Sequence, residues 1–258
     1  MVFLIIHFVI FFLIIKFIEN VQKLTFVWGM INWTVAIGIL YFVPIQFIPI
    51  DAKTEDNGLK IIRAIICGII PPITEDVGRF IVFTFIYKSK KHNFNNSIIF
   101  GAGIGGWESI ILMIMIQTSN LSNFYAIKNS KNEEELNNKL LKIYEKYKDG
   151  MAIDNFLELI CRFTGNIYHI CGSMIAYRLS LNRKERKNII YFSICFILHF
   201  IIDFITYLVN ILELNIWLNL AFPGLVIIIF VISYFIWTEN KNKDYTEIEL
   251  ENNENLIK

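Results

Sequence analysis

The residues best suited to chemistry are charged and imidazole side chains that lie inside long apolar runs of the chain. A charge at the middle of a bilayer costs about 2.5–3.5 kcal/mol, so such groups must face one another or a water-filled cavity. A carboxylate beside imidazoles suits hydrolysis, because the carboxylate can take a proton from water while the imidazoles bind that water, hold a metal or stabilise an oxyanion. The groups concerned are Glu75, Asp76, Arg79, Glu108, Arg162, His169, His199 and Asp203.

The spacing of these residues is helical, which brings several of them onto common faces. Asp203 follows His199 by one turn, where its carboxylate can fix the tautomer of the imidazole. The glycine-rich run 101–106 comes just before Glu108 and lets another helix approach closely. The groups that share a face are Glu75 with Arg79, Arg162 with His169 and Ser173, and His199 with Asp203.

The segments that must position these groups are predicted to be membrane-spanning helices. The chain has 258 residues, 55% of them hydrophobic, and its apolar runs approach the ~20 residues that cross a bilayer as a helix. We therefore predict an all-α polytopic membrane bundle of about seven transmembrane helices. Pro71 and Pro72 predict a kink or break in the third. The spans lie near residues 2–18, 26–48, 59–87, 98–118, 156–179, 189–211 and 215–237.

Loop charges predict an orientation and a division of the chain. Lysines and arginines concentrate after the third and fifth spans, and cytoplasmic loops carry such an excess. The N-terminus is therefore predicted outside and the C-terminus inside. We expect a bundle over residues 1–238 and a polar cytoplasmic tail over 239–258. Helical spacing in the long outer loop predicts an amphipathic helix near 131–148, on the membrane or over the bundle mouth, with a solvated linker helix as the alternative.

Composition and missing motifs exclude several function classes. A net charge of +1 gives no indication of a nucleic-acid surface, and cysteines inside apolar runs argue against a disulfide framework. Neither His-Glu-x-x-His nor Gly-x-Ser-x-Gly occurs, which excludes the corresponding metalloprotease and serine-hydrolase signatures. Cys195 shares a face with His199, which offers a Cys/His metal site as an alternative. This alternative ranks below the carboxylate interpretation.

Short motifs also resemble a known group of enzymes. The segment Glu75-Asp76-Val77-Gly78-Arg79 resembles the acidic-pair-plus-arginine motif of the CAAX-protease and bacteriocin-processing superfamily of intramembrane proteases. His199 with Asp203 resembles its final His-x-x-x-Asn/Asp motif, and His169 would match its middle histidine. Within that superfamily the chain looks most like the YhfC family. The second acid is Asp where the superfamily usually has Glu, and the substrate is left open.

The resemblance implies an intramembrane peptidase, glutamate-type or metal-dependent. Glu75 would activate water with His169 and His199 as partners. The glutamate route needs no cofactor, while a divalent metal is the alternative. The expected substrate is a membrane-associated protein or peptide, and the expected location is a bacterial cell membrane. The supporting residues would be Asp76, Arg79, Glu108, Arg162, Ser173 and Asp203.

Two other functions fit the same residues. Midplane acids and histidines also form proton relays in transporters, where broken helices make substrate sites. A non-catalytic scaffold or immunity protein could keep the bundle without the reaction. A scaffold, however, could lose these costly groups freely, and no internal repeat supports the transporter.

Overall fold

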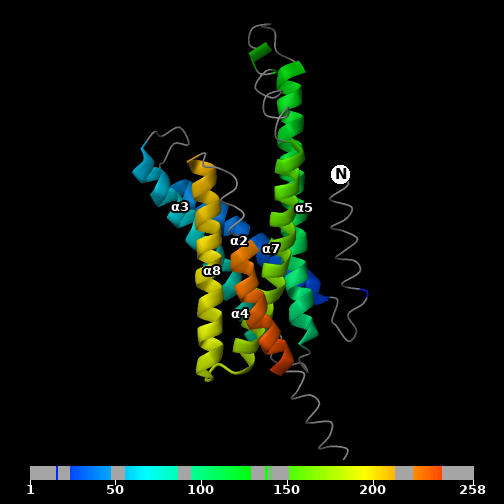
Figure 1. The fold of residues 1–258 in the computed structure, drawn as a ribbon, viewed down its shortest axis with the longest axis vertical. Coiled ribbons are helices and arrows are strands. Elements are labelled where there is room, and N and C mark those ends of the chain that lie inside the picture. Colours follow the sequence, from blue (N-terminus) through cyan, green and yellow to red (C-terminus); the bar gives the residue numbers. More distant parts are fainter. Residues whose placement is uncertain are drawn as a thin grey trace, which may run out of the picture.

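The computed structural model describes residues 24–47, 56–86, 94–128, 151–212 and 223–239, with isolated positions at 16, 137, 138 and 140. In this part of the chain the regular elements are all helices, as the predicted fold class requires (Figure 1). The predicted first span, nearly all of the helix near 131–148 and the tail beyond Glu239 lie outside the described residues.

The described helices cover most of the second to sixth predicted spans and the part of the seventh from residue 223 onward. By length and composition, Arg186–Val209 qualifies as a membrane span within the described residues, while Leu24–Leu40 and Pro223–Glu239 are shorter apolar helices. The number of crossings and the orientation therefore stay predictions. The elements are α2 Leu24–Phe47, α3 Asn57–Pro71, the π-helix η1 Pro72–Asp76, α4 Val77–Ile81, the π-helix η2 Val82–Ile86, α5 Asn95–Lys128, α7 Met151–Leu181 and α8 Arg186–Ile211, followed by the helix Pro223–Glu239.

The third predicted span stays helical through its prolines by changing helix type. A proline has no N–H, so the carbonyls four residues earlier, those of Cys67 and Gly68, lose their usual α-helical partners. In the turn that follows, the Thr74 hydroxyl donates to the carbonyls of Ile70, at 2.9 Å, and Pro71, at 3.2 Å. The expected kink or break is thus a π-helical turn, a distortion often found at functional sites. Both adjacent acids, Glu75 and Asp76, lie in it.

Helix α5 packs closely against both α2 and α7 because glycines line its contacts. A Cβ atom added at Gly101 would overlap the backbone of His169 and Ile170 in α7, and one at Gly103 would overlap the Phe26 carbonyl in α2. Small residues permit this approach of backbones in membrane bundles. The packing sets Glu108, on α5, beside the face of α7 that carries His169.

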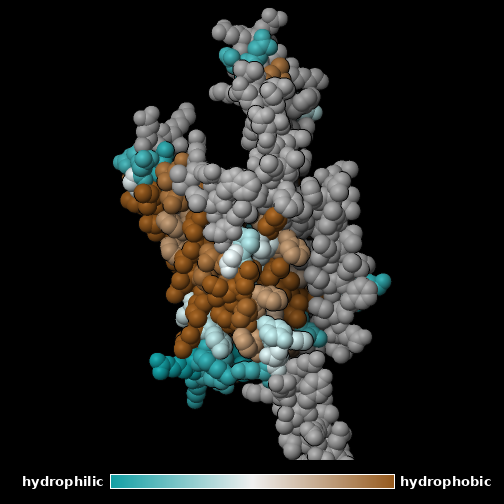
Figure 2. All heavy atoms as spheres, in the orientation of Figure 1, coloured by the Kyte–Doolittle hydropathy of each residue, from teal (hydrophilic) through white to brown (hydrophobic). Residues whose placement is uncertain are grey.

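The polarity of the molecule is the reverse of a soluble domain's. Large apolar side chains such as Ile197, Ile227 and Phe235 are exposed, while Arg79 and Asp76 are buried. Figure 2 shows a broad hydrophobic surface over the described helices, with hydrophilic residues gathered near the α7–α8 turn at one end. An apolar exterior around a charged interior is the arrangement that a bilayer requires.

Candidate active site

Arg79 lies at the centre of the buried charged cluster, and its side chain has no exposed surface. One guanidinium nitrogen, Nη1, contacts the Asp76 carboxylate. The other, Nη2, lies 3.3 Å from Glu75 Oε2. Because arginine keeps its charge in proteins and presents several donors in a fixed plane, it compensates both carboxylates of the π turn and holds them in place.

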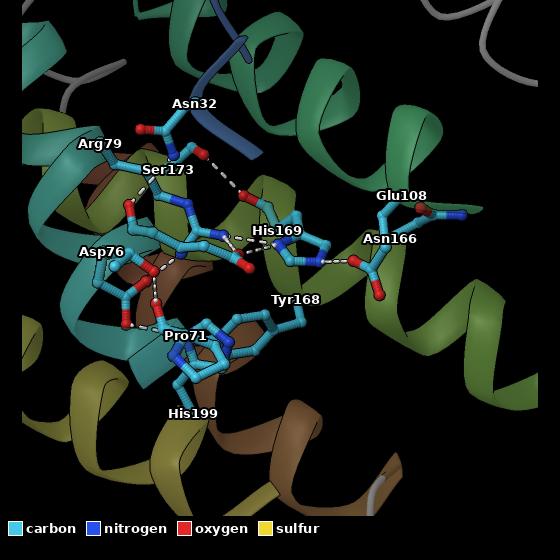
Figure 3. Close-up of polar contacts among 12 residues, drawn as sticks. Asn32, Pro71, Asp76, Arg79, Glu108, Asn166, Tyr168, His169, Ser173 and His199 are labelled. Carbon is cyan, nitrogen blue, oxygen red and sulfur yellow. Dashed lines mark hydrogen bonds and ion pairs between the residues drawn. The ribbon is translucent and has the colours of Figure 1, made fainter. Parts of the chain in front are cut away.

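His169 joins this group from α7 and lies between carboxylates of different helices (Figure 3). Its Nδ1 lies 2.6 Å from Arg79 Nη2. A guanidinium can only donate, so Nδ1 accepts and the ring proton belongs on Nε2. That nitrogen lies 2.5 Å from Glu108 Oε2, while Glu75 Oε2 is 3.6 Å from Nδ1. The contacts thus fix both the tautomer and the orientation of the ring.

His199 approaches from α8 and is held by acids on both sides. Its Nδ1 lies 3.1 Å from Asp76 Oδ2, and its Nε2 lies 3.3 Å from Asp203 Oδ2. Ionised carboxylates only accept hydrogen bonds, so this arrangement suits an imidazolium, which can donate from both nitrogens. The Tyr168 ring packs on it with 4.7 Å between ring centroids. The two histidine rings are 6.4 Å apart, centroid to centroid.

The partly exposed edge of the cluster is formed by Glu108, Arg162 and Asp203. Their side chains are 23%, 25% and 25% exposed, against 8% for Glu75. Arg162 Nη1 lies 3.2 Å from Glu108 Oε1, so this carboxylate bridges Arg162 and His169. The more accessible acids therefore lie on α5 and α8, whereas the acids of the π turn are the most deeply enclosed.

Two side chains singled out in the sequence are turned to other partners. The Ser173 hydroxyl donates to the backbone carbonyl of His169, at 2.7 Å, within its own helix. Cys195 Sγ lies 3.7 Å from the Tyr168 hydroxyl, in an apolar cluster. Ser173 thus supports the backbone that carries His169, and Cys195 contacts Tyr168.

Asn32, on α2, also belongs to the cluster, although the sequence did not single it out. Its side-chain Nδ2 donates to the backbone carbonyl of Glu75 at 3.3 Å, and its side chain reaches the cluster in Figure 3. The available signal was a single amide inside an apolar run. Such a residue more often forms an ordinary interhelical bond, so the signal alone does not select it.

Most of the chain matches one known protein family. The family model of the YhfC intramembrane metalloproteases matches residues 1–221. The chain belongs to this family. The resemblance to the YhfC family is thereby confirmed, and the chain is a membrane protein of a protease family. No curated protein and no solved structure matches it.

The YhfC description implies a metal ion, and the cluster can be tested for one. A ligand must direct a free nitrogen or an ionised oxygen at the metal. His169 instead directs Nδ1 at the cation of Arg79, and the 2.5 Å between its Nε2 and Glu108 leaves no room for an ion. Both nitrogens of His199 face carboxylates. Within the described residues no group of three or more potential ligands is arranged to hold a metal. As packed, these residues do not fit a metal ion.

Proposed function

We propose that this member of the YhfC family hydrolyses a peptide bond of a membrane-associated protein or peptide, with a water activated by Glu75 and assisted by His169 and His199. The supporting observation is that the carboxylates of Glu75 and Glu108 flank one buried imidazole inside an apolar bundle. Held in this way, the imidazole keeps one tautomer and one orientation, which general acid–base chemistry needs.

Glu75 is the group that activates water, because its carboxylate is fixed beside His169 Nδ1 and Arg79. In the first step the carboxylate takes one proton from water while the water oxygen bonds to the carbonyl carbon of the peptide. The carbonyl π electrons move to oxygen and form an oxyanion. His169 helps by holding its ring beside this carboxylate, with Nδ1 at 3.6 Å from Glu75 Oε2, so that the base keeps its position.

Positive charge near the reacting atoms stabilises the oxyanion. Arg79 is a buried cation, and His199 is held between Asp76 and Asp203 in a geometry that suits an imidazolium. Fixed charges of this kind stabilise a developing anion more strongly in a water-poor interior than in water. When the oxyanion collapses, the C–N bond breaks and the proton held by Glu75 passes to the leaving amine, which completes hydrolysis.

A purely structural role explains the cluster less well. Apolar side chains of similar volume often replace a buried ion pair without loss of stability. A bundle that needed only packing would gain little from keeping acids, an arginine and histidines together at 0–8% side-chain exposure. Chemistry gives a reason to retain them.

The test compares membranes from cells that carry wild-type protein, Glu75→Gln or Glu185→Gln. Glu185 lies on the turn between α7 and α8, outside the cluster, and serves as the matched control. New protein N-termini near membrane segments are expected with wild type and Glu185→Gln. Glu75→Gln should reduce them by about 100-fold or more, the contribution of a general base.

Identical sets of N-termini for all three proteins, each folded and equally abundant, would reject the peptidase. Uptake of labelled solutes into vesicles would then decide between a transporter and a scaffold.

A further inference from the structure

The π turn that carries Glu75 and Asp76 is held from outside its own helix. Pro71, just before it, and Pro72, its first residue, have no backbone N–H, and the wider turn departs from the regular α-helical bonding pattern. Within the segment, the Thr74 hydroxyl donates hydrogen bonds to the carbonyls of Ile70 and Pro71. Arg79, in the adjoining α4, holds the two carboxylates, and contacts with other helices hold the backbone of the turn.

Asn32 supplies such a contact from α2. Its Nδ2 donates to the Glu75 backbone carbonyl at 3.3 Å, across 43 residues of sequence. Asn32 is buried, with 8% of its surface exposed. In a bilayer an unbonded amide has no water to turn to, so this bond is costly to break. It acts on the backbone of the residue whose carboxylate faces His169.

Gly78 shows that the fit around Asn32 is tight. A Cβ atom added at Gly78 would overlap the Asn32 side-chain oxygen, and its three nearest atoms would all belong to that side chain. Gly78 is the second residue of α4, two residues after the π-helix ends at Asp76. The glycine of the segment Glu75–Arg79 is therefore explained by the space that the Asn32 amide needs.

We propose that Asn32 is a positioning residue, which fixes the π turn through the Glu75 carbonyl and requires glycine at position 78. The inference rests on the proposed function for its kinetic consequences. Its structural part concerns the Asn32–Gly78 pair alone and holds independently of the reaction.

The test is a double-mutant cycle with Asn32→Ala, Gly78→Ala and the combined variant. Each single change displaces or removes the same amide, so each is expected to reduce kcat by about 10- to 100-fold, the effect of a small misplacement of a reacting group. KM should stay unchanged, because Asn32 acts through the Glu75 backbone. The combined variant should be no worse than Asn32→Ala, since the added Cβ then has room.

Two further variants sharpen the result. Asn32→Asp keeps the size of the side chain but cannot donate when ionised, so its kcat should be reduced as in Asn32→Ala. Gly38→Ala, also on α2, is the control, because a Cβ there meets nothing within 4 Å; it should behave as wild type. Additive losses in the combined variant, or a normal kcat in Asn32→Ala, would overturn the proposal.

Hydrogen exchange separates this inference from the peptidase itself. Amides of residues 73–78 should exchange faster in Asn32→Ala and Gly78→Ala than in Gly38→Ala. If the wild-type protein cleaved nothing, the proposed function would fail, and these exchange rates would still decide the role of Asn32. Unchanged local exchange would reject it.

Discussion

At the scale of single residues, the site is a chain of charge pairs around His169. Arg79 binds the acids of the π turn and also donates to Nδ1 of the imidazole, while Glu108 accepts from Nε2. Removing one partner of a buried charge pair leaves the other uncompensated, which costs about 3–5 kcal/mol. Each polar member therefore depends on its neighbours, and single substitutions should act through the group.

Glu108 offers a graded test of this dependence. Glu108→Gln keeps an oxygen that can accept the Nε2 proton but loses the charge that pairs with Arg162. Glu108→Leu loses both. We expect activity to fall by about 10-fold for Gln and about 100-fold for Leu, because a small misplacement of a reacting group can cost about 100-fold. Cleavage of the substrate found by proteomics would measure this.

The control for this series is Ser109→Ala, the next residue on α5, whose hydroxyl contacts Asn166 at 3.4 Å. It should retain most of the activity. Equal activity in Glu108→Leu and wild type would show that His169 is oriented without Glu108.

At the scale of elements, the position of His169 depends on how closely α5 and α7 approach. Gly101 is the clearest point of contact, because an added Cβ would overlap the His169 carbonyl and the Ile170 backbone. A small residue is needed here for close packing rather than for an unusual backbone angle. The glycine-rich run thus serves the site by allowing Glu108 to reach the imidazole from the neighbouring helix.

Gly101→Ala should separate these helices. Overpacking at a tight contact costs about 1–3 kcal/mol, so the unfolding temperature in detergent should fall, together with activity. Gly165→Ala, on α7, is matched to it, because a Cβ there meets nothing within 4 Å. That variant should be as stable as wild type. Equal stability of both variants would contradict the close approach of α5 and α7.

At the scale of the whole molecule, the bundle brings distant segments into one charged interior. The last described helix also contacts the ends of α7 and α8 next to their connecting turn. There Glu239 accepts from Lys187 at 3.1 Å and from Arg178 at 3.3 Å. The exterior between the polar ends is apolar. To admit a metal ion, the bundle would have to release histidine nitrogens from partners on η1, α4, α5 and α8.

Metal removal tests the packed arrangement directly. We expect purified protein to keep its activity after dialysis against a chelator, and elemental analysis to find less than one equivalent of zinc. The reason is that the ring nitrogens of His169 and His199 already face Arg79 or carboxylates. Activity lost with the metal and restored by added zinc would mean that the cluster opens to bind it.

Much of the fold and of the candidate site follows from the sequence. Apolar runs of bilayer length predict the helices, because a buried backbone must bond within its own segment. Charged groups inside those runs predict an interior cluster, because exposing them to lipid costs too much. On this basis Glu75, His169 and His199 could be selected, and the motifs around them indicated the YhfC family.

Tertiary structure decided how those groups are connected. Helical periodicity shows which residues share a face, but it does not give the rotation of one helix against another. That rotation sets Glu108 on Nε2 of His169 and Asp76 on Nδ1 of His199. It also brings Asn32 to the Glu75 carbonyl. Contacts across 43 to 123 residues depend on side-chain packing between helices, which spacing along one helix does not record.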